Sequence, residues 1–145
     1  MNVKVKKINR NAVIPTRGSG MAAGYDLYAC CNETVYVKPH ETVKIGTGLS
    51  IQSPKGYFGA IFARSGIAAK NGLRPANCVG VCDEDYTGEY IVAMHNDTET
   101  TQQILHGDRI AQLVFLPYLS INFKETSEEL DETERGNCGF GSTGK

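Results

Sequence analysis

Short segments in which apolar and polar residues alternate dominate this chain. Clear alternation covers residues 3–6, 35–38, 43–45 and 49–52, and compact apolar runs cover residues 57–62, 90–94 and 110–116. Alternation with a period of two predicts strands that bury one face. Glycine and proline separate these segments at intervals of about ten residues, which is typical of an all-β sandwich or barrel.

Helical periodicity is scarce. The one stretch that favours a helix is residues 65–70, with the sequence SGIAAK. We expect Ser65 to cap this short helix, since serine hydroxyls accept hydrogen bonds from free amides at helix starts. Gly72 is expected to end it.

The last part of the chain differs in character. Residues 127–134 carry five carboxylates, and the final eleven residues, RGNCGFGSTGK, contain four glycines. Because neither stretch can bury much apolar surface, we predict a β domain at 1–125 and a flexible tail at 126–145. The tail combines Arg135, Phe140, Ser142 and Thr143. A cation, a flat ring and two hydroxyls suit a lid over a nucleoside phosphate, although glycine-rich tails also exist without a function.

Composition and charge exclude several classes of protein. The 145 residues predict one domain, and the formal net charge of −1 provides no basic field for nucleic acid. The chain has no apolar run of membrane-spanning length and no apolar signal segment at its start. Its five cysteines lack the spacing of a disulfide framework or a zinc site. We therefore expect a soluble intracellular protein, in the cytoplasm or nucleus, with free thiols.

One phosphate-binding pattern in the tail is misleading. Residues 139–145, GFGSTGK, fit the spacing G-x-x-x-x-G-K. A phosphate-binding P-loop must be followed by Ser or Thr and a helix, and here the sequence stops at the lysine. We reject a P-loop.

A second candidate for anion binding lies where a predicted strand meets the predicted helix. Arg64 offers a guanidinium group, Ser65 a hydroxyl and Gly66 an unshielded amide. Helix starts attract anions, because free amides and the helix dipole favour negative charge there. The plainer alternative is that Ser65 caps the helix and Arg64 pairs with a carboxylate.

Three consecutive carboxylates, Asp83, Glu84 and Asp85, precede Tyr86 in a predicted hairpin. They suit a solvated turn, and they equally suit a general base beside a hairpin that grips a nucleobase edge. No Ser–His–Asp or Cys–His arrangement can be assembled from the local sequence.

Two further polar positions interrupt apolar strands. Asp26 follows small residues in one strand, and Gln112 lies within another, so each needs partners if it is buried. Taken alone, Asp26 is more often a structural partner than a metal ligand. Asp108 and Arg109, at the turn before Gln112, could pair with each other.

Together these segments resemble the trimeric dUTPase family. Five motifs occur in the family's order: AAGYDLYA at 22–29, ARSGIA at 63–68, NCVGVCDEDYTG at 77–88, GDRIAQL at 107–113 and RGNCGFGSTG at 135–144. The resemblance implies a jelly-roll-like β fold and a homotrimer with active sites shared between subunits. It implies hydrolysis of dUTP to dUMP and pyrophosphate with Mg²⁺, which keeps uracil out of DNA and supplies dUMP for thymidylate synthesis. No nucleic acid or membrane partner is implied.

The resemblance also implies roles for the third motif. Asp83 matches the general base, which would activate the water that attacks the α-phosphate. Tyr86 matches the residue under the deoxyribose that leaves no room for a 2′-hydroxyl. Asn77 and backbone groups of the following hairpin, Gly80 among them, would read the uracil edge.

The phosphate contacts are implied by three other motifs. Arg64, Ser65 and Gly66 match a phosphate-binding segment that comes from a neighbouring subunit, and Gln112 matches a glutamine near the same phosphates. Asp26 matches an acid that meets Mg²⁺ through water.

The tail completes the implied site. Arg135, Ser142 and Thr143 match contacts to the γ-phosphate, and Phe140 matches a ring that stacks on uracil when the tail closes. Gly141 belongs to the same substrate-binding segment.

Two positions depart from the family pattern. Ala63 stands where proline is usual, and Cys82 stands where isoleucine is usual; neither change removes a reacting group. Two alternative functions remain open on the sequence. One is dCTP deamination, by enzymes that resemble dUTPases in fold but usually lack this tail, and the other is a nucleotide-binding module that has lost catalysis.

Overall fold

The computed structural model describes residues 2–139, and it confirms the predicted all-β fold with one short helix. Its elements, in chain order, are β1 (Lys4–Lys7), β2 (Tyr25–Tyr28), β3 (Val35–Val37), β4 (Thr42–Gln52), β5 (Tyr57–Phe62), α1 (Ser65–Asn71), β6 (Leu73–Pro75), β7 (Val79–Cys82), β8 (Glu89–Asn96), β9 (Gln102–Ile104) and β10 (Arg109–Pro117). The predicted pattern missed only the short strands β6 and β9.

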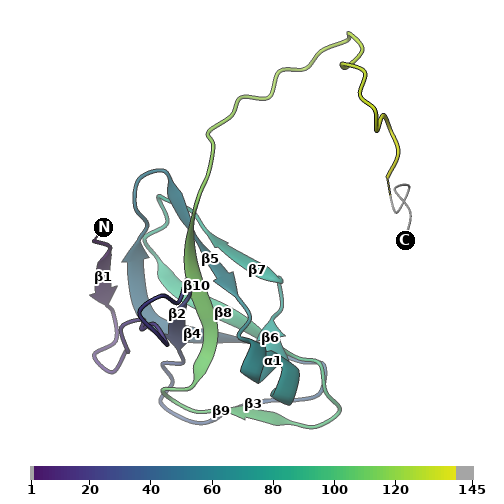
Figure 1. Cartoon of the computed structure of the whole chain (residues 1–145). Coiled ribbons are helices and arrows are strands. Elements are labelled where there is room, and N and C mark those ends of the chain that lie inside the picture. The colour runs from purple at the N-terminus through teal and green to yellow at the C-terminus, as the bar shows by residue number, and fades with distance from the viewer. Residues whose placement is uncertain (1, 140–145) are drawn as a thin grey trace.

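The strands form two four-stranded antiparallel sheets and one small pair. One sheet has the order β1-β4-β8-β6, the other has the order β2-β10-β5-β7, and β3 pairs with β9. A single apolar core joins the two large sheets; Leu27, Leu113, Leu49 and Tyr90 are completely buried in it. Figure 1 shows the compact body that results, with α1 and the β3–β9 pair at one end.

Strand β4 corrects one expectation. The glycines at 46 and 48 were expected to separate two strands, yet residues 42–52 form one continuous strand. The register with β8 shifts between Gly46 and Ser50, as in a β-bulge, and Gly48 takes a φ of 68° that glycine adopts without strain. The Glu89 carboxylate accepts the Gly48 N–H at 2.7 Å, which satisfies the amide that the bulge leaves unpaired.

The predicted helix is present as α1, but its expected cap is wrong. Arg64 occupies the N-cap position without a side-chain cap, and Ser65 is the first helical residue. Its hydroxyl therefore lies inside the first turn instead of closing it. Gly72 ends the helix in the left-handed conformation, as predicted, with a φ of 61°.

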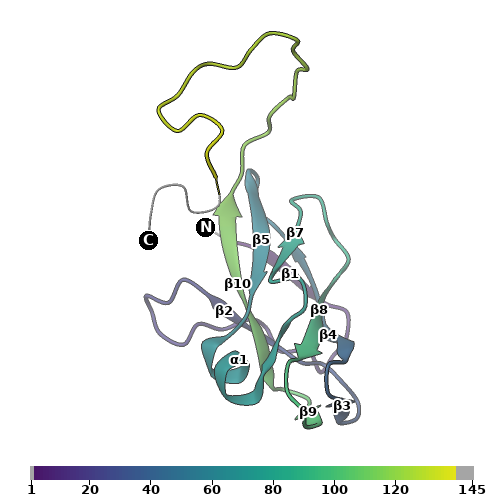
Figure 2. The same ribbon diagram turned by 90° about the vertical axis from the view of Figure 1, so that its right-hand side faces the viewer.

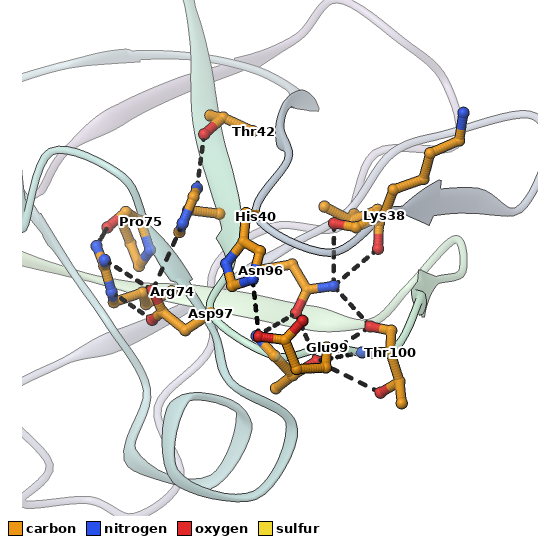
Figure 3. A network of polar contacts seen from close by, with 12 residues as sticks. Lys38, His40, Thr42, Arg74, Pro75, Asn96, Asp97, Glu99 and Thr100 are labelled. Atoms are coloured by element: carbon orange, nitrogen blue, oxygen red, sulfur yellow. Dashed lines mark hydrogen bonds and ion pairs between the residues drawn. The ribbon is translucent and has the colours of Figure 1, made fainter.

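A polar network fixes the end of β8, between the third and fourth predicted motifs (Figure 3). The buried Asn96 side chain donates to the carbonyls of Val37, Lys38 and Thr100, and it accepts two hydrogen bonds from Thr98. It therefore holds β8, β3 and the turn that leads to β9 in one arrangement.

Regular structure ends at Pro117. Residues 118–139 are exposed and contain neither strand nor helix, and Figures 1 and 2 show them leaving the body at the end opposite α1. Within residues 2–139, none of the helical structure is long and apolar enough to cross a membrane.

Candidate active site

Three of the five sequence motifs meet in one hollow, here called the arginine hollow. It encloses about 360 Å³ and is lined by Gly18, Ala22, Ala23, Gly24, Asp26, Arg64, Ser65, Gly66, Arg109 and Gln112. These residues come from the loop before β2, from β2 itself, from the β5–α1 junction and from β10. The sheet order brings them together, because β10 lies between β2 and β5.

Asp26 is the buried centre of this hollow. Its Oδ1 accepts a hydrogen bond from Arg64 Nε at 2.6 Å, and its Oδ2 lies 3.3 Å from a terminal nitrogen of Arg109. The expected pairing of Arg109 with Asp108 is therefore wrong. Asp108 instead accepts the N–H of Leu105 across its own turn, while β2–β10 pairing aims Arg109 at Asp26. One carboxylate thus orients two guanidinium groups.

Gln112 packs closely against the loop before β2. Its amide nitrogen donates to the Ala63 carbonyl at 2.8 Å, which ties β10 to the residue before Arg64. A Cβ on Gly24 would lie 2.5 Å from the Gln112 side-chain oxygen, so a larger residue there would displace the Gln112 amide. Gln112 thus finds its polar partner at Ala63 and packs against Gly24, and both segments border the hollow.

Ser65 and Gly66 present the start of α1 to solvent. Both residues are exposed, and a Cβ built on Gly66 would meet nothing within 4 Å. No internal packing therefore requires glycine at this position. With two adjacent guanidinium groups, these unshielded groups can receive an anion.

The third motif lines a different cavity, here called the acidic hollow. It encloses about 740 Å³ and is lined by Gln52, Phe58, Val81, Asp83, Glu84, Asp85 and Tyr118. Asp83 directly follows β7 and is exposed. Within the part of the chain that the structure describes, its carboxylate takes part in no hydrogen bond or ion pair. It is therefore free to accept a proton from a water molecule.

Glu84 has the opposite character from Asp83. Its Oε2 accepts the Gly56 N–H at 2.7 Å and the Tyr118 hydroxyl at 2.8 Å. The bond from Gly56, followed by the bond from Tyr118, lowers the pKa of Glu84, while the Glu84 carboxylate raises the pKa of Tyr118. Glu84 is thus an anchored acid beside a free one.

Tyr86 lies folded back over its own hairpin. Its hydroxyl donates to the Glu89 carbonyl at 2.9 Å, and a Cβ on Gly88 would lie 2.5 Å from that hydroxyl. Its ring centroid lies 6.1 Å from that of the buried Tyr90. Glycine at 88 therefore lets the ring form a flat, exposed platform.

The entrance to β7 has an unusual backbone. Cys78 adopts a φ of 58°, and the Val79 N–H donates to the Asn77 carbonyl in a tight turn around it. Positive φ values outside glycine are uncommon and cluster at functional sites. Asn77 is exposed, and Gly80 lies close enough for a Cβ to meet the Ile61 Cβ at 3.1 Å.

The two hollows lie at opposite ends of β5. Cys82 pairs with Gly59, which places Asp83 beside Phe58, whereas Arg64 follows the far end of the strand. The interval from Phe58 to Arg64 corresponds to about 20 Å of extended strand at roughly 3.4 Å per residue. One chain therefore does not bring its own Asp83 to its own arginines.

An apolar sheet face connects the two hollows. The register places side chains from β7, β5 and β10 on the same outer face: Val79, Val81, Phe58, Phe62, Val114 and Leu116. Val81 is 62% exposed, and the others are partly exposed. The face continues into Gln112 and Asp26.

The predicted site residues of the tail are described only in part. Arg135 donates to the carbonyl of Cys138 within the tail. Phe140, Gly141, Ser142 and Thr143 lie outside the described residues. Arg109 was not predicted as a residue of the hollow, although it lies in the GDRIAQL motif. Glu84 and Tyr118 were not predicted to have individual roles.

The described residues offer few side chains that could hold a metal ion. Among residues 2–139 no cluster of three or more His, Cys, Asp or Glu side chains could hold a metal ion. Of the described residues, Asp26 is the one acid that lines the arginine hollow, and its Oδ2 has a single partner among them, at 3.3 Å. Mg²⁺ commonly keeps several waters and binds one or two carboxylates together with substrate phosphates, so this set fits water-mediated contact.

Comparison with known proteins identifies close relatives over nearly the whole chain. Residues 10–144 match the sequence model of the dUTPase family. The deoxyuridine 5'-triphosphate nucleotidohydrolase of Candida albicans is 44% identical over 99% of this chain and 89% of its own length. That of Nautilia profundicola is 43% identical over 100% of both chains. The structure of the Staphylococcus bacteriophage 80alpha dUTPase with dUpNHpp superposes with a TM-score of 0.91 at 30% identity, covering 99% of both chains.

Proposed function

The chain belongs to the dUTPase family and is a dUTP diphosphatase, and from this we propose that Asp83 is the general base of the hydrolysis. The observation that carries the proposal is the contrast between two neighbouring acids. Glu84 is held by two hydrogen bonds, whereas Asp83 is exposed with a free carboxylate in the acidic hollow. A general base needs an unoccupied oxygen within hydrogen-bond reach of the attacking water. The hydrolase names of the relatives argue against the deaminase alternative.

The chemistry divides between the two hollows. Asp83 takes the proton as water attacks the α-phosphorus, the bond from that phosphorus to the bridging oxygen breaks, and pyrophosphate leaves. Arg64 and Arg109, both oriented by Asp26, neutralise charge on the phosphates. Positioned cations of this kind usually supply much of the catalysis of phosphoryl transfer. Ser65, Gly66 and Gln112 complete the phosphate contacts.

Because the hollows lie about 20 Å apart along one chain, we infer that each site forms between subunits of a homotrimer. The apolar face between the hollows supports this, since a second copy seated on it would shield Val81, Phe58 and their neighbours from water. It would also bring its own arginine hollow toward Asp83 of the first copy. Three copies joined by the same head-to-tail contact can close into a ring, in which every copy uses both of its contact surfaces.

Mg²⁺ completes the charge neutralisation in this proposal. When bound to the triphosphate, the ion would withdraw electron density from the phosphoryl oxygens. Asp26 would hold it through water with its less occupied Oδ2. The two guanidinium groups remain the direct contribution of this chain to phosphate binding.

Substrate selection falls to the hairpin after Cys78. Tyr86, held flat against Gly88, would lie under the deoxyribose and exclude a 2′-hydroxyl. Asn77 and the backbone at Gly80 would bind the uracil edge. The backbone close to the base would leave no room for the methyl group of thymine.

The tail would close each site. Phe140 would stack on uracil, while Arg135, Ser142 and Thr143 would contact the γ-phosphate and Gly141 would let the chain approach it. Closure would exclude water that is not aligned for attack. In the cell, the reaction would keep uracil out of DNA and supply dUMP for thymidylate synthesis.

The decisive experiment measures pyrophosphate release from dUTP with Mg²⁺. Asp83→Asn should bind a non-hydrolysable dUTP analogue normally but lose at least ~10²-fold in kcat, because a positioned base typically contributes that much. Asp97→Asn, an exposed acid outside both hollows, is the matched control. If Asp83→Asn turns over dUTP at a rate near that of wild type, Asp83 is not the general base.

A mixing experiment tests the shared site. Asp83→Asn and Arg64→Ala chains should each be inactive alone. Refolded together in equal amounts, they should recover about a quarter of wild-type activity, since random closed trimers then contain that fraction of intact shared sites. Sites built within single chains would recover nothing.

A further inference from the structure

We propose that Glu84 and Tyr118 form a clamp that positions Asp83 for catalysis and joins the catalytic hairpin to the segment that leads from β10 to the tail. The inference rests on the proposed role of Asp83. The clamp is defined by Glu84, Tyr118 and Gly56, which come from three separate parts of the chain. None of the three is required to touch the substrate.

The geometry of the clamp is a closed ring of hydrogen bonds. Glu84 Oε2 accepts the Gly56 N–H at 2.7 Å and the Tyr118 hydroxyl at 2.8 Å. The Tyr118 N–H in turn donates to the Gly56 carbonyl at 3.2 Å. The ring therefore ties the β7–β8 hairpin to the β4–β5 turn and to the first residue after β10.

This ring acts on Asp83 through the chain. Glu84 follows Asp83 directly, so anchoring its side chain limits how far the Asp83 backbone can move. A second hydrogen bond holds the Asp83 backbone itself, since the Tyr86 N–H donates to the Asp83 carbonyl at 3.1 Å. A base displaced by about 1 Å can lose ~10²-fold in rate, and the anchors at Glu84 and at the Asp83 carbonyl oppose such a displacement.

The same ring fixes the first residue of the segment that leads from β10 to the tail. Tyr118 is the first residue beyond β10, and it lines the acidic hollow together with Asp83. Its hydroxyl donates to Glu84, the residue next to the base. One oxygen atom of Glu84 therefore links the position of the base to the direction in which the chain leaves β10. Charged hydrogen bonds of this kind are stronger than neutral ones, which favours a carboxylate at position 84.

The test compares Glu84→Ala, Glu84→Gln and Tyr118→Phe in steady-state dUTP hydrolysis. Glu84→Ala should lower kcat roughly 10- to 100-fold while KM changes less than about threefold, because the base moves but the phosphate contacts remain. Glu84→Gln keeps an acceptor oxygen and should recover most of the lost kcat. Tyr118→Phe should lower kcat by about three- to tenfold.

A double variant separates the clamp from general destabilisation. If Glu84 and Tyr118 act through their shared bond, Glu84→Ala with Tyr118→Phe should lower kcat little more than Glu84→Ala alone. Additive losses would overturn the inference. Glu33→Gln and Tyr36→Phe, two exposed positions outside both hollows, serve as matched controls and should behave as wild type.

Asp83→Asn, measured in parallel, distinguishes a failure of the clamp inference from a failure of the base assignment. If it is inactive while Glu84→Ala and Tyr118→Phe keep wild-type kcat, the clamp inference fails and the base assignment stands. If Asp83→Asn is active, the proposed function fails first. If Glu84→Ala does not fold, Tyr118→Phe decides the question, because this substitution removes a single exposed oxygen. An unchanged kcat in Tyr118→Phe overturns the clamp inference.

Discussion

Arg64 donates to Asp26 across 2.6 Å, and this bond joins the N-cap residue of α1 to the middle of β2. The Asp26 side chain is only 12% exposed, so most of the bond is shielded from water. The pair therefore determines where the Arg64 guanidinium points and contributes to stability at the same time.

The first prediction follows from this pair. Asp26→Asn should lower the free energy of unfolding by about 1–3 kcal/mol, because it leaves a partly buried guanidinium without its charged acceptor. It should also raise KM for dUTP, since Arg64 and Arg109 lose their common orienting group. Urea denaturation and steady-state kinetics measure the two effects.

The chain supplies a matched control for that prediction. Arg74 and Asp97 form the same kind of bond at the same 2.6 Å, but their side chains are 38% and 44% exposed. Asp97→Asn should cost at most about 1 kcal/mol, as exposed pairs usually do, and should leave KM unchanged. Equal losses in the two variants would contradict the structural role of Asp26.

The second prediction concerns Gly66. A Cβ at this position meets nothing within 4 Å, and the residue lies in the first turn of α1. Gly66→Ala should therefore keep the thermal unfolding temperature or raise it slightly, because alanine favours a helix by up to about 1 kcal/mol over glycine. If the open space receives a phosphate, kcat/KM should fall at least ~10-fold.

A change at Gly24 provides the contrast. Gly24→Ala places a Cβ against the Gln112 side chain and should lower both stability and activity. A Gly66→Ala enzyme with normal kcat/KM would show that the exposed start of α1 does not approach the substrate.

The third prediction concerns the buried Asn96 network of Figure 3. Asn96→Ala removes three donated and two accepted hydrogen bonds and leaves buried carbonyls without partners. The free energy of unfolding should fall by about 2–5 kcal/mol. Below the new unfolding transition, kcat should match wild type, because the network lies outside both hollows. Guanidinium denaturation and kinetics at low temperature test both statements.

The fourth prediction concerns alkaline pH. Burial, more than any neighbouring group, raises the pKa of Tyr90 to about 12 and that of Cys82 to about 11. Each group keeps its proton more tightly when the protein is folded, so each contributes stability below the ordinary pKa of 10.0 or 9.0. That contribution is lost as the pH rises through the folded-state values. The unfolding temperature should therefore fall steadily above pH 9.

Tyr90→Phe isolates one of the two groups. This variant cannot ionise at position 90, so its unfolding temperature should fall less steeply than that of wild type between pH 10 and 12. Tyr36→Phe, at a tyrosine that is 63% exposed, should follow the wild-type curve. Parallel curves for Tyr90→Phe and wild type would show that the Tyr90 proton is not linked to folding.

Much of this molecule was predictable from local sequence. Alternation of apolar and polar residues predicted most of the strands, because a strand with one buried face needs that pattern wherever it lies in the sheet. Gly72 predicted the end of α1, because the left-handed conformation there strains other residues. The order of the five motifs predicted the family.

The partners of the functional side chains could not be predicted in this way. Asp26 meets Arg64 because β10 lies between β2 and β5, and Glu84 meets Tyr118 because β10 ends beside the hairpin that carries Asp83. Sheet order and register also decided that β4 continues through its glycines as a bulge. These contacts join residues 34 or more positions apart, and their geometry depends on how all the strands pack around one core. Local sequence determined which groups this protein carries, and tertiary structure alone decided which of them are held and which are left free.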